Sequence, residues 1–384
     1  MLTDEQIRNL YRLPTPCYVI DEGRLIQNLE ILAGVRERTG CKILLAQKAF
    51  SCYHLYPLIA QYLDGTTSSG LHEATLAHKY MPRRNSFGDI ENHVFAPAYK
   101  DDDFIRIAEI CNHVVFNSKA QYERHRAASK AHGVSIGLRV NPEIMTQTFE
   151  HGMYDPCAPK SRMGIRDLSD IDLSDVEGLH FHTLCEQNSD ALEITLDRVI
   201  RRYGHLFTKM KWVNFGGGHH ITREDYDIPR LERCIRRVTD TGLTVYLEPG
   251  EAVALNAGYM VAEILDIVEN EVPVAITDAS AACHMPDVLE VPYTPDVLNI
   301  EKGEQDVRIA GNTCLAGDVI GDYKFVRVPK FGERIVFGDM AIYTMVKNNT
   351  FNGIPLPAIG LLTRHGTDVK LLKEFGYDEF ERRL

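Results

Sequence analysis

Short apolar runs recur along the first two thirds of the chain, and each is followed by a stretch in which apolar residues have helical spacing. Between Arg24 and Arg38, for example, Leu25, Leu29 and Leu32 fall on one helical face. Short apolar runs that are bounded by turn residues predict buried strands, and the stretches between them predict amphipathic helices. The eight predicted strands are residues 43–47, 65–68, 93–96, 113–117, 135–141, 178–184, 211–215 and 244–248.

This alternation predicts an α/β fold in which the strands and their helices form a (β/α)8 barrel over residues 22–258. Beyond it the pattern changes to short alternating runs at 262–268, 274–277, 307–310 and 334–337, which predict a second, mostly β domain over residues 259–384. Residues 1–21 contain a strand-like run at 15–20. They are expected to join the second domain, because chain termini often lie close together.

The composition suits an ordinary protein of two such domains, with 384 residues of which 44% are hydrophobic. A formal charge of -12 without any cluster of lysine and arginine argues against nucleic acid as a partner. The same charge favours a small cationic molecule, although many proteins are acidic merely for solubility. Nine cysteines without a Cys-x-x-Cys pair argue against a disulfide framework or a zinc ribbon. The chain has neither an apolar stretch of about 18 residues nor a signal peptide, so a cytoplasmic protein without a membrane partner is expected.

Lys48 follows the apolar run of residues 43–47, at the predicted end of a buried strand. A lysine that is partly desolvated there loses its proton more easily, and the neutral amine attacks a carbonyl carbon. Taken alone, the position also suits a lysine whose stem lies on the core while its ammonium group reaches water. In a barrel, reactive groups gather at the carboxyl ends of the strands, and Arg139, His182 and Glu248 occupy equivalent places. We therefore expect an active site at this end of the barrel.

Three consecutive glycines, Gly216, Gly217 and Gly218, follow the seventh predicted strand. Without side chains, their backbone N–H groups can converge on a phosphate group, and phosphate sites of barrels often lie after the last two strands. A flexible turn is the alternative interpretation. Glu248, at the end of the eighth strand, could hold a protonated ring nitrogen or a cationic substrate group, or it could cap the Pro-Gly turn that follows.

His180 and His182 share one face of their strand, because alternate residues of a strand point the same way. The pair could bind a metal ion, with Asp278 as a further ligand in a barrel hydrolase, or one imidazole could stack on a flat cofactor ring. Cys314 lies in a glycine-containing loop together with Asp318. Its thiol could act as an acid, or it could be a small buried apolar side chain, as free cysteines more commonly are.

Five of these features stand in one order along the chain: Ala46-Gln47-Lys48-Ala49, His180-Phe181-His182, Gly216-Gly217-Gly218, Glu248-Pro249-Gly250 and residues 314–318. Because of these features and their order, the chain resembles the pyridoxal-phosphate decarboxylases of the alanine-racemase fold. This is the family of the ornithine, arginine and diaminopimelate decarboxylases, and the resemblance extends from about Thr15 to Gly353. Within that family it looks like the members that act on carboxynorspermidine and carboxyspermidine. Residues 45–51, 182–187 and 283–290 carry that closer resemblance.

The resemblance implies pyridoxal 5'-phosphate as the cofactor and no metal ion. Lys48 would bind the cofactor covalently. Cys314, from the partner subunit of a homodimer with shared active sites, would return a proton to the substrate. The other cofactor-binding residues that the resemblance implies are Arg139, His182, Gly216, Gly217, Gly218, Glu248 and Tyr343. In chemical terms, decarboxylation next to an amine leaves a carbanion, and a protonated pyridine ring spreads that charge.

Two departures from the family pattern concern the substrate. Glu251 stands where ornithine and diaminopimelate enzymes usually have an arginine, and Leu315 stands where ornithine enzymes commonly have an acid. An acid in place of the arginine disfavours a substrate with a distal carboxylate and favours an amine. We therefore expect a cationic carboxylated polyamine as substrate, converted to norspermidine or spermidine in polyamine biosynthesis. The carboxylates predicted to bind its amines are those of Glu251, Asp287, Glu290 and Asp318.

Three other functions stay open at this point. They are an ornithine- or diaminopimelate-type decarboxylase, a metal-dependent barrel hydrolase, and an inactive protein that binds a decarboxylase. The last has no need of Lys48, three glycines and Cys314 together, so these residues argue against it. The sequence does not rank carboxynorspermidine against carboxyspermidine, because one methylene group is worth only about 1–3 kcal/mol in a pocket.

Overall fold

The computed structural model describes residues 2–147 and 154–384, which form two compact units. Asn28–Val253 make up the first, called here the barrel unit. Met1–Gln27 and Ala254–Leu384 make up the second, called here the sheet unit. None of the helices in the described part of the chain has the length and apolar character needed to span a membrane.

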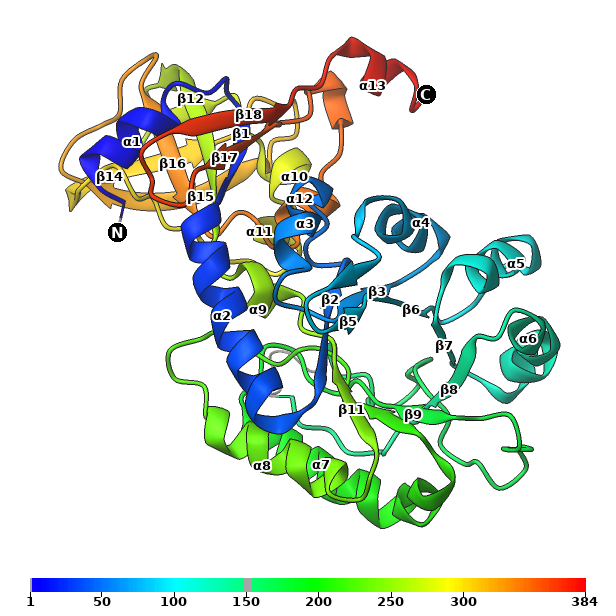
Figure 1. Ribbon diagram of the computed structural model, residues 1–384. Coiled ribbons are helices and arrows are strands. Elements are labelled where there is room, and N and C mark those ends of the chain that lie inside the picture. Colours follow the sequence, from blue (N-terminus) through cyan, green and yellow to red (C-terminus); the bar gives the residue numbers. More distant parts are fainter. Residues whose placement is uncertain (1, 148–153) are drawn as a thin grey trace. The chain divides into compact units, whose positions relative to one another are not determined.

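In the described part of the barrel unit, eight parallel strands close into a barrel in the order β10, β11, β2, β3, β6, β7, β8 and β9 (Figure 1). The closed barrel confirms the fold predicted from the apolar runs. The strands are β2 (Lys42–Ala46), β3 (Gly65–Ser68), β6 (Glu91–Phe95), β7 (His113–Phe116), β8 (Ser135–Arg139), β9 (Gly178–His180), β10 (Trp212–Asn214) and β11 (Thr244–Leu247).

The helices of the barrel unit each bury one face. In α8 (Ile228–Thr239) the buried residues Leu231, Cys234, Ile235 and Val238 have the spacing of a single helical stripe. Asp227 caps this helix by accepting the N–H of the third residue along, as capping residues do. The other helices are α2 (Glu22–Thr39), α3 (Tyr56–Ile59), α4 (Leu71–Tyr80), α5 (Asp101–Ile110), α6 (Lys119–Ala131), α7 (Ser189–Tyr203), α9 (Glu251–Ala254) and the 3-10 helices η1 (Tyr53–Leu55) and η3 (Gly204–Lys209). The short strands β4 (Arg84–Asn85) and β5 (Gly88–Asp89) form a separate pair.

The middle of the barrel is filled by an apolar layer around Trp212. A Cβ atom on Gly137 would lie 2.2 Å from the indole ring, and one on Gly178 would lie 2.0 Å from it, so glycine at both positions makes room for the ring. The other buried members of this layer are Leu44, Val115 and Tyr246.

Two strands of the barrel end at least two residues earlier than predicted. The strand predicted at 135–141 ends at Arg139, and the one predicted at 178–184 ends at His180. Beyond these points side-chain hydrogen bonds act beside a few backbone bonds, such as that from the Val140 N–H to the His180 carbonyl oxygen. The guanidinium group of Arg139 donates to the carbonyl oxygen of His182 at 3.0 Å, and the Gly217 N–H donates to Nδ1 of His182 at 2.7 Å.

The described strands of the sheet unit form one sheet in the order β15, β14, β13, β12, β1, β17 and β18, with β16 beside β12. Strand β1, from the start of the chain, pairs with β12 and β17 and so belongs to this sheet. The strands are β1 (Cys17–Asp21), β12 (Gly258–Val268), β13 (Val274–Thr277), β14 (Lys302–Ala310), β15 (Val319–Phe325), β16 (Arg334–Gly338), β17 (Ala358–Leu362) and β18 (Val369–Lys373). The helices are α1 (Asp4–Leu10), α10 (Ala281–His284), α11 (Asp287–Glu290), α12 (Thr344–Lys347), α13 (Tyr377–Glu381) and η4 (Phe351–Gly353).

Candidate active site

A cavity of about 300 Å³ lies at the carboxyl ends of the barrel strands. Its lining residues are Ala46, Lys48, Thr67, Ser68, Ser69, Phe95, Pro97, Arg139, Tyr154, Pro156, Met163, His180, His182, Gly217 and Glu248. Lys48, Arg139, His182, Gly217 and Glu248 were all predicted site residues, and they line this one cavity. A cavity of similar size between α7, η3 and α8 is lined by one charged side chain and gathers no such groups. The first cavity is therefore the candidate active site.

The side chain of Lys48 lines the cavity, where part of its surface is accessible but many protein atoms surround its amine. This desolvation lowers the pKa of Lys48, and the positive charge of Arg139 lowers it further. The carboxylate of Glu248 raises the pKa of Lys48, but by less than burial and Arg139 lower it. In the described parts of the chain, no carboxylate lies within ion-pair distance of the amine. A larger share of the Lys48 side chain is therefore the neutral amine, which is the nucleophilic form.

Arg139 and His182 form one wall of the cavity. The guanidinium carbon of Arg139 lies 4.6 Å from the centroid of the Phe95 ring, and burial lowers the pKa of Arg139 to about 10, so it remains a cation at neutral pH. Burial, followed by the charges of Lys48 and Arg139, holds the pKa of His182 well below its usual value. Because Nδ1 of His182 accepts the Gly217 N–H, the ring is neutral with its proton on Nε2. A neutral imidazole in one fixed orientation can stack on a flat ring.

The glycine loop requires glycine at both ends. Gly216 and Gly218 have φ values of 70° and 80°, which disfavour any side chain. A Cβ atom on Gly216 would also lie 2.6 Å from the Phe181 carbonyl oxygen, and one on Gly218 would lie 2.0 Å from that of Leu184. The backbone N–H groups of Gly218 and His219 have no acceptor among the residues that the structure describes. Two such groups in succession can bind an anion such as phosphate.

Both oxygens of the buried Glu248 carboxylate are held in place. Oε1 accepts a hydrogen bond from Nδ2 of Asn214 at 2.8 Å, and Oε2 lies 3.2 Å from Nε2 of His180. Burial alone would raise the pKa of Glu248, but His180 and Asn214 outweigh it and lower the pKa to about 2. Burial lowers the pKa of His180, so the pair is an ionised glutamate and a neutral histidine that donates. Asn214 also accepts the N–H of Gly216 at 2.8 Å, and thereby orients the carboxylate and the glycine loop together.

The cavity thus combines an amine of lowered pKa, a neutral imidazole, free N–H groups and a fixed carboxylate. A ligand with an aldehyde, a phosphate group and a basic ring nitrogen would satisfy all of them. Comparison with known proteins decides the family. The profile described as "Pyridoxal-dependent decarboxylase, C-terminal sheet domain" matches residues 17–341. The chain belongs to the pyridoxal-dependent decarboxylases.

Two relatives of this decarboxylase are similar over almost their whole length. A carboxynorspermidine/carboxyspermidine decarboxylase of Campylobacter jejuni is 43% identical over 97% of this chain and 99% of its own. A carboxyaminopropylagmatine decarboxylase of Synechocystis is 37% identical over 98% of this chain and 96% of its own. The crystal structure of carboxynorspermidine decarboxylase from C. jejuni, complexed with norspermidine, superposes with a TM-score of 0.88 at 42% identity and covers 97% of this chain and 100% of that one. The family confirms the predicted cofactor class and reaction class.

Cys314 and Tyr343, which the resemblance implicates in the decarboxylase site, lie in the sheet unit. Cys314 is exposed, and its N–H donates to Oδ1 of Asn352 at 2.6 Å. Tyr343 precedes α12 with a φ of 52°, and the ammonium nitrogen of Lys347 lies 5.6 Å from its ring centroid. Within the sheet unit these contacts assign neither residue a chemical role, so both roles stay predictions.

The three predicted substrate acids of the sheet unit differ in their surroundings. Asp287 and Glu290, on α11, share the ammonium group of Lys347. Asp318 is buried, and its oxygens accept several hydrogen bonds from neighbouring residues. The donors are Ser280, Ala282 and Thr313. These bonds give Asp318 a structural role in the loop that carries Cys314, and its contact with substrate stays a prediction.

Glu251 lies in a cluster with two residues that sequence reasoning missed. Its Oε2 is 3.2 Å from Nε2 of His220, and Glu186, His220 and Glu251 each offer an atom within 4.8 Å of the others. His220 is buried, and the contact lacks the geometry of a hydrogen bond, so neither ring nitrogen has a hydrogen-bond partner among the described residues. Two carboxylates beside an imidazole that has no hydrogen-bond partner in the described chain form an anionic cluster suited to an ammonium group.

Asn214 was also missed, and His180 was considered as a metal ligand or a stacking ring but not as a partner of Glu248. Asn214 could have been found from its spacing, since it stands near the end of the seventh predicted strand, two residues before the glycine loop, and shares the face of Trp212 on that strand. The metal interpretation of His180 and His182 is not supported, because His180 faces Glu248 and His182 is bonded to the glycine loop. In the described chain, the histidine-containing groups suited to a metal ion lie elsewhere.

Proposed function

We propose that the protein decarboxylates carboxynorspermidine, carboxyspermidine or both, to norspermidine and spermidine in polyamine biosynthesis. The C. jejuni relative named for these two substrates supports the proposal, since it is 43% identical along nearly the whole chain. The structural observation that carries it is the cluster of Glu251, Glu186 and His220 in the barrel unit. Two carboxylates close together repel each other, and a substrate ammonium group would relieve that repulsion.

The residues of the cavity fit pyridoxal phosphate, and we propose a role for each. The Lys48 amine would bind the aldehyde carbon, the N–H groups of Gly218 and His219 the phosphate, and the neutral ring of His182 one face of the pyridine. The Glu248 anion would hold a proton at the ring nitrogen. When bound, the cofactor supplies a ring that accepts the electrons left on the substrate as carbon dioxide leaves.

Proton return and assembly extend the proposal. Cys314 would supply the proton to the α-carbon from a second copy of the chain, in a homodimer whose sites are shared. Its exposure in a single chain supports this, because a thiol needs access to a partner's substrate. Tyr343, Asp287 and Glu290 would complete that site, and the enzyme would be cytoplasmic.

The test of the substrate is carbon-dioxide release across a panel of carboxynorspermidine, carboxyspermidine, carboxyaminopropylagmatine, ornithine and diaminopimelate. The third compound is included because a relative is named for it. We expect the highest kcat/KM with the first two. Highest kcat/KM with ornithine or diaminopimelate would contradict the proposal.

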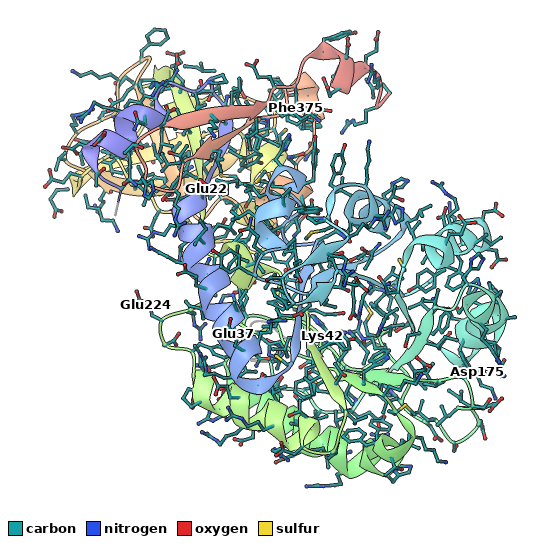
Figure 2. All side chains as sticks on the ribbon, viewed as in Figure 1. Glu22, Glu37, Lys42, Asp175, Glu224 and Phe375 are labelled. Atoms are coloured by element: carbon teal, nitrogen blue, oxygen red, sulfur yellow. The ribbon has the colours of Figure 1, made fainter. Side chains whose placement is uncertain are left out.

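The role of Glu251 is tested in the same assay with Glu251→Gln. Losing a charge-assisted hydrogen bond of about 1.5–3 kcal/mol should raise KM for the polyamine acids about tenfold to hundredfold while kcat changes little. Glu224→Gln is the matched control, because Glu224 is an exposed glutamate on an outer loop of the barrel unit (Figure 2). An unchanged KM in Glu251→Gln would remove Glu251 from the substrate site.

A further inference from the structure

The amino-terminal end of the barrel holds a second cluster of polar side chains. Glu91 and His93 lie on β6, and His113 begins the neighbouring strand β7. Because all barrel strands run the same way, their first residues gather at the end opposite to Lys48 and Glu248. The proposed decarboxylation uses no group at this end of the barrel.

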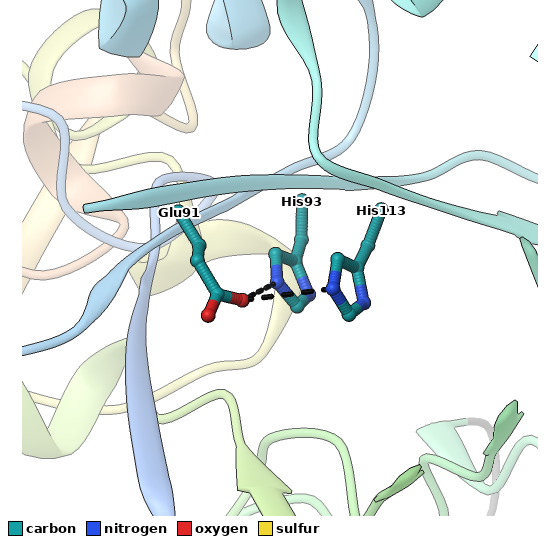
Figure 3. Close-up of side chains that lie close together, drawn as sticks. All are labelled: Glu91, His93 and His113. Atoms are coloured by element: carbon teal, nitrogen blue, oxygen red, sulfur yellow. Dashed lines mark hydrogen bonds and ion pairs between the residues drawn. The ribbon is translucent and has the colours of Figure 1, made fainter. Parts of the chain in front are cut away.

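The three side chains of this cluster lie side by side, with the His93 ring between the Glu91 carboxylate and the His113 ring (Figure 3). Nε2 of His93 is 2.7 Å from Oε2 of Glu91, and Nε2 of His113 is 3.7 Å from the same oxygen. The two imidazole rings stack with centroids 3.9 Å apart and planes 11° apart. The three residues offer ligand atoms that all lie within 4.8 Å of one another. One glutamate and two histidines are a known ligand set of zinc sites that keep an open fourth position.

The two imidazoles of this cluster are incompletely paired. His93 is 1% exposed, and among the described residues Nδ1 of His93 and Nδ1 of His113 have no hydrogen-bond partner. Buried polar atoms without partners are uncommon in folded proteins, and an absent ion is one of their explanations. Two neighbouring histidines in one buried place therefore keep ring nitrogens that are available to a cation.

The surroundings of the cluster restrict water and orient Glu91. The hydroxyl of Tyr246 donates to Oε2 of Glu91 at 3.0 Å, and the rings of Trp212 and Tyr246 lie 5.1 Å and 5.4 Å from that of His113. An aromatic enclosure lowers the local dielectric constant and strengthens an ion's interaction with its ligands. A carboxylate held by a hydrogen bond is the usual support of a metal ligand.

The positive charge of Lys42 disfavours binding of a metal ion at this cluster. Its ammonium group pairs with Oε1 of Glu91, and leaves Oε2 to face the two imidazoles. The Lys42 side chain is 39% exposed, so it can turn toward solvent when another cation arrives. Its charge lowers the affinity for a metal ion, and its removal should therefore raise that affinity.

We propose that Glu91, His93 and His113 bind a divalent transition-metal ion, with Zn²⁺ as the expected occupant. The ion ties β6 to β7 at the amino-terminal end of the barrel. Residues at the amino-terminal end of a barrel serve stability rather than catalysis, so the ion has a structural role, with water in its fourth position, and takes no part in decarboxylation.

The experiment measures Zn²⁺ binding to the chelator-treated holoenzyme by equilibrium dialysis and elemental analysis. We expect saturable binding of one ion per chain and about a tenfold or greater loss of affinity in His113→Gln and in His93→Gln. The matched control His205→Gln replaces an exposed histidine of η3 and should bind like the wild type. Lys42→Met should bind more tightly than the wild type. Because a folding defect does not tighten binding, this variant distinguishes a real site from misfolding.

Three outcomes would overturn the proposal. The first is no saturable binding by the wild type, or wild-type affinity in both His93→Gln and His113→Gln. The second is loss of binding in His220→Gln alone, which would place the ion at the cluster of Glu186, His220 and Glu251. The third is loss of binding in Cys314→Ser alone, which would place it at the exposed thiol.

Discussion

The hydrogen bond from Asn214 orients the carboxylate of Glu248 and lowers its pKa, and Asn214→Leu tests this role. The replacement has a similar volume but cannot donate to Oε1 of Glu248 or accept from the Gly216 N–H. A pKa of about 2 for Glu248, against an ordinary value of 4.5, corresponds to about 3 kcal/mol in favour of the anion. Asn214 and His180 provide this stabilisation against the opposing effect of burial.

The loss of one hydrogen bond to a charged group costs about 1.5–3 kcal/mol. If Glu248 holds the proton at the cofactor ring, Asn214→Leu should therefore lower kcat about tenfold to hundredfold. The pKa of Glu248 should rise, because one partner is lost while its burial remains. The acid limb of the pH dependence of kcat, measured by carbon-dioxide release, should consequently move to higher pH.

Thr183→Val is the matched control for Asn214→Leu. It removes a buried hydrogen bond beyond the neighbouring strand β9, from the Thr183 hydroxyl to that of Thr195 at 3.2 Å, which does not involve Glu248. It should lower stability and leave kcat and the acid limb unchanged. If Asn214→Leu kept the wild-type kcat and an unmoved acid limb, Asn214 would have no role in holding Glu248 ionised.

Three further predictions concern stability, the glycine loop and assembly. Burial lowers the pKa of His284 to about 4, so the unfolded chain binds more protons between pH 6.5 and 4, and about 3 kcal/mol of unfolding free energy should be lost over that window. Urea unfolding should show a flatter pH dependence in His284→Gln. Gly218→Ala should weaken cofactor binding more than tenfold, as measured by absorbance titration, because its Cβ would meet a carbonyl oxygen at 2.0 Å. Gly242→Ala, with a φ of 89° and no atom within 4 Å of its Cβ, should bind normally. Equal mixtures of Lys48→Ala and Cys314→Ala protein should recover about a quarter of wild-type activity if sites are shared across a dimer, and none if each chain holds a complete site.

The apolar pattern was sufficient for the barrel, because buried parallel strands leave continuous apolar runs that are separated by amphipathic helices. Strand ends were less predictable. Residues 181–184 read as a continuation of β9, but side-chain bonds from Arg139 and to Gly217 hold this segment in a different path. Such tertiary contacts leave no periodic signal in the sequence.

Some of the site residues could be predicted from the sequence, and others could not. Lys48, Glu248 and the glycine loop carry unusual residue types at strand ends, so sequence alone could propose them. Asn214 and His220 are common polar residues, and their importance depends on what the fold brings against them. The cluster of Glu91, His93 and His113 was likewise hidden, because its members come from two strands and from the end of the barrel where no reaction was expected.

The most direct test of the central claim is to locate the cofactor in the protein. Treating the holoenzyme with borohydride fixes pyridoxal phosphate to the lysine that binds it, and mass spectrometry of the digested protein identifies the modified residue. The account predicts a single label on Lys48 and none in Lys48→Ala. A label on another lysine in the wild type, or full decarboxylase activity in Lys48→Ala, would contradict it.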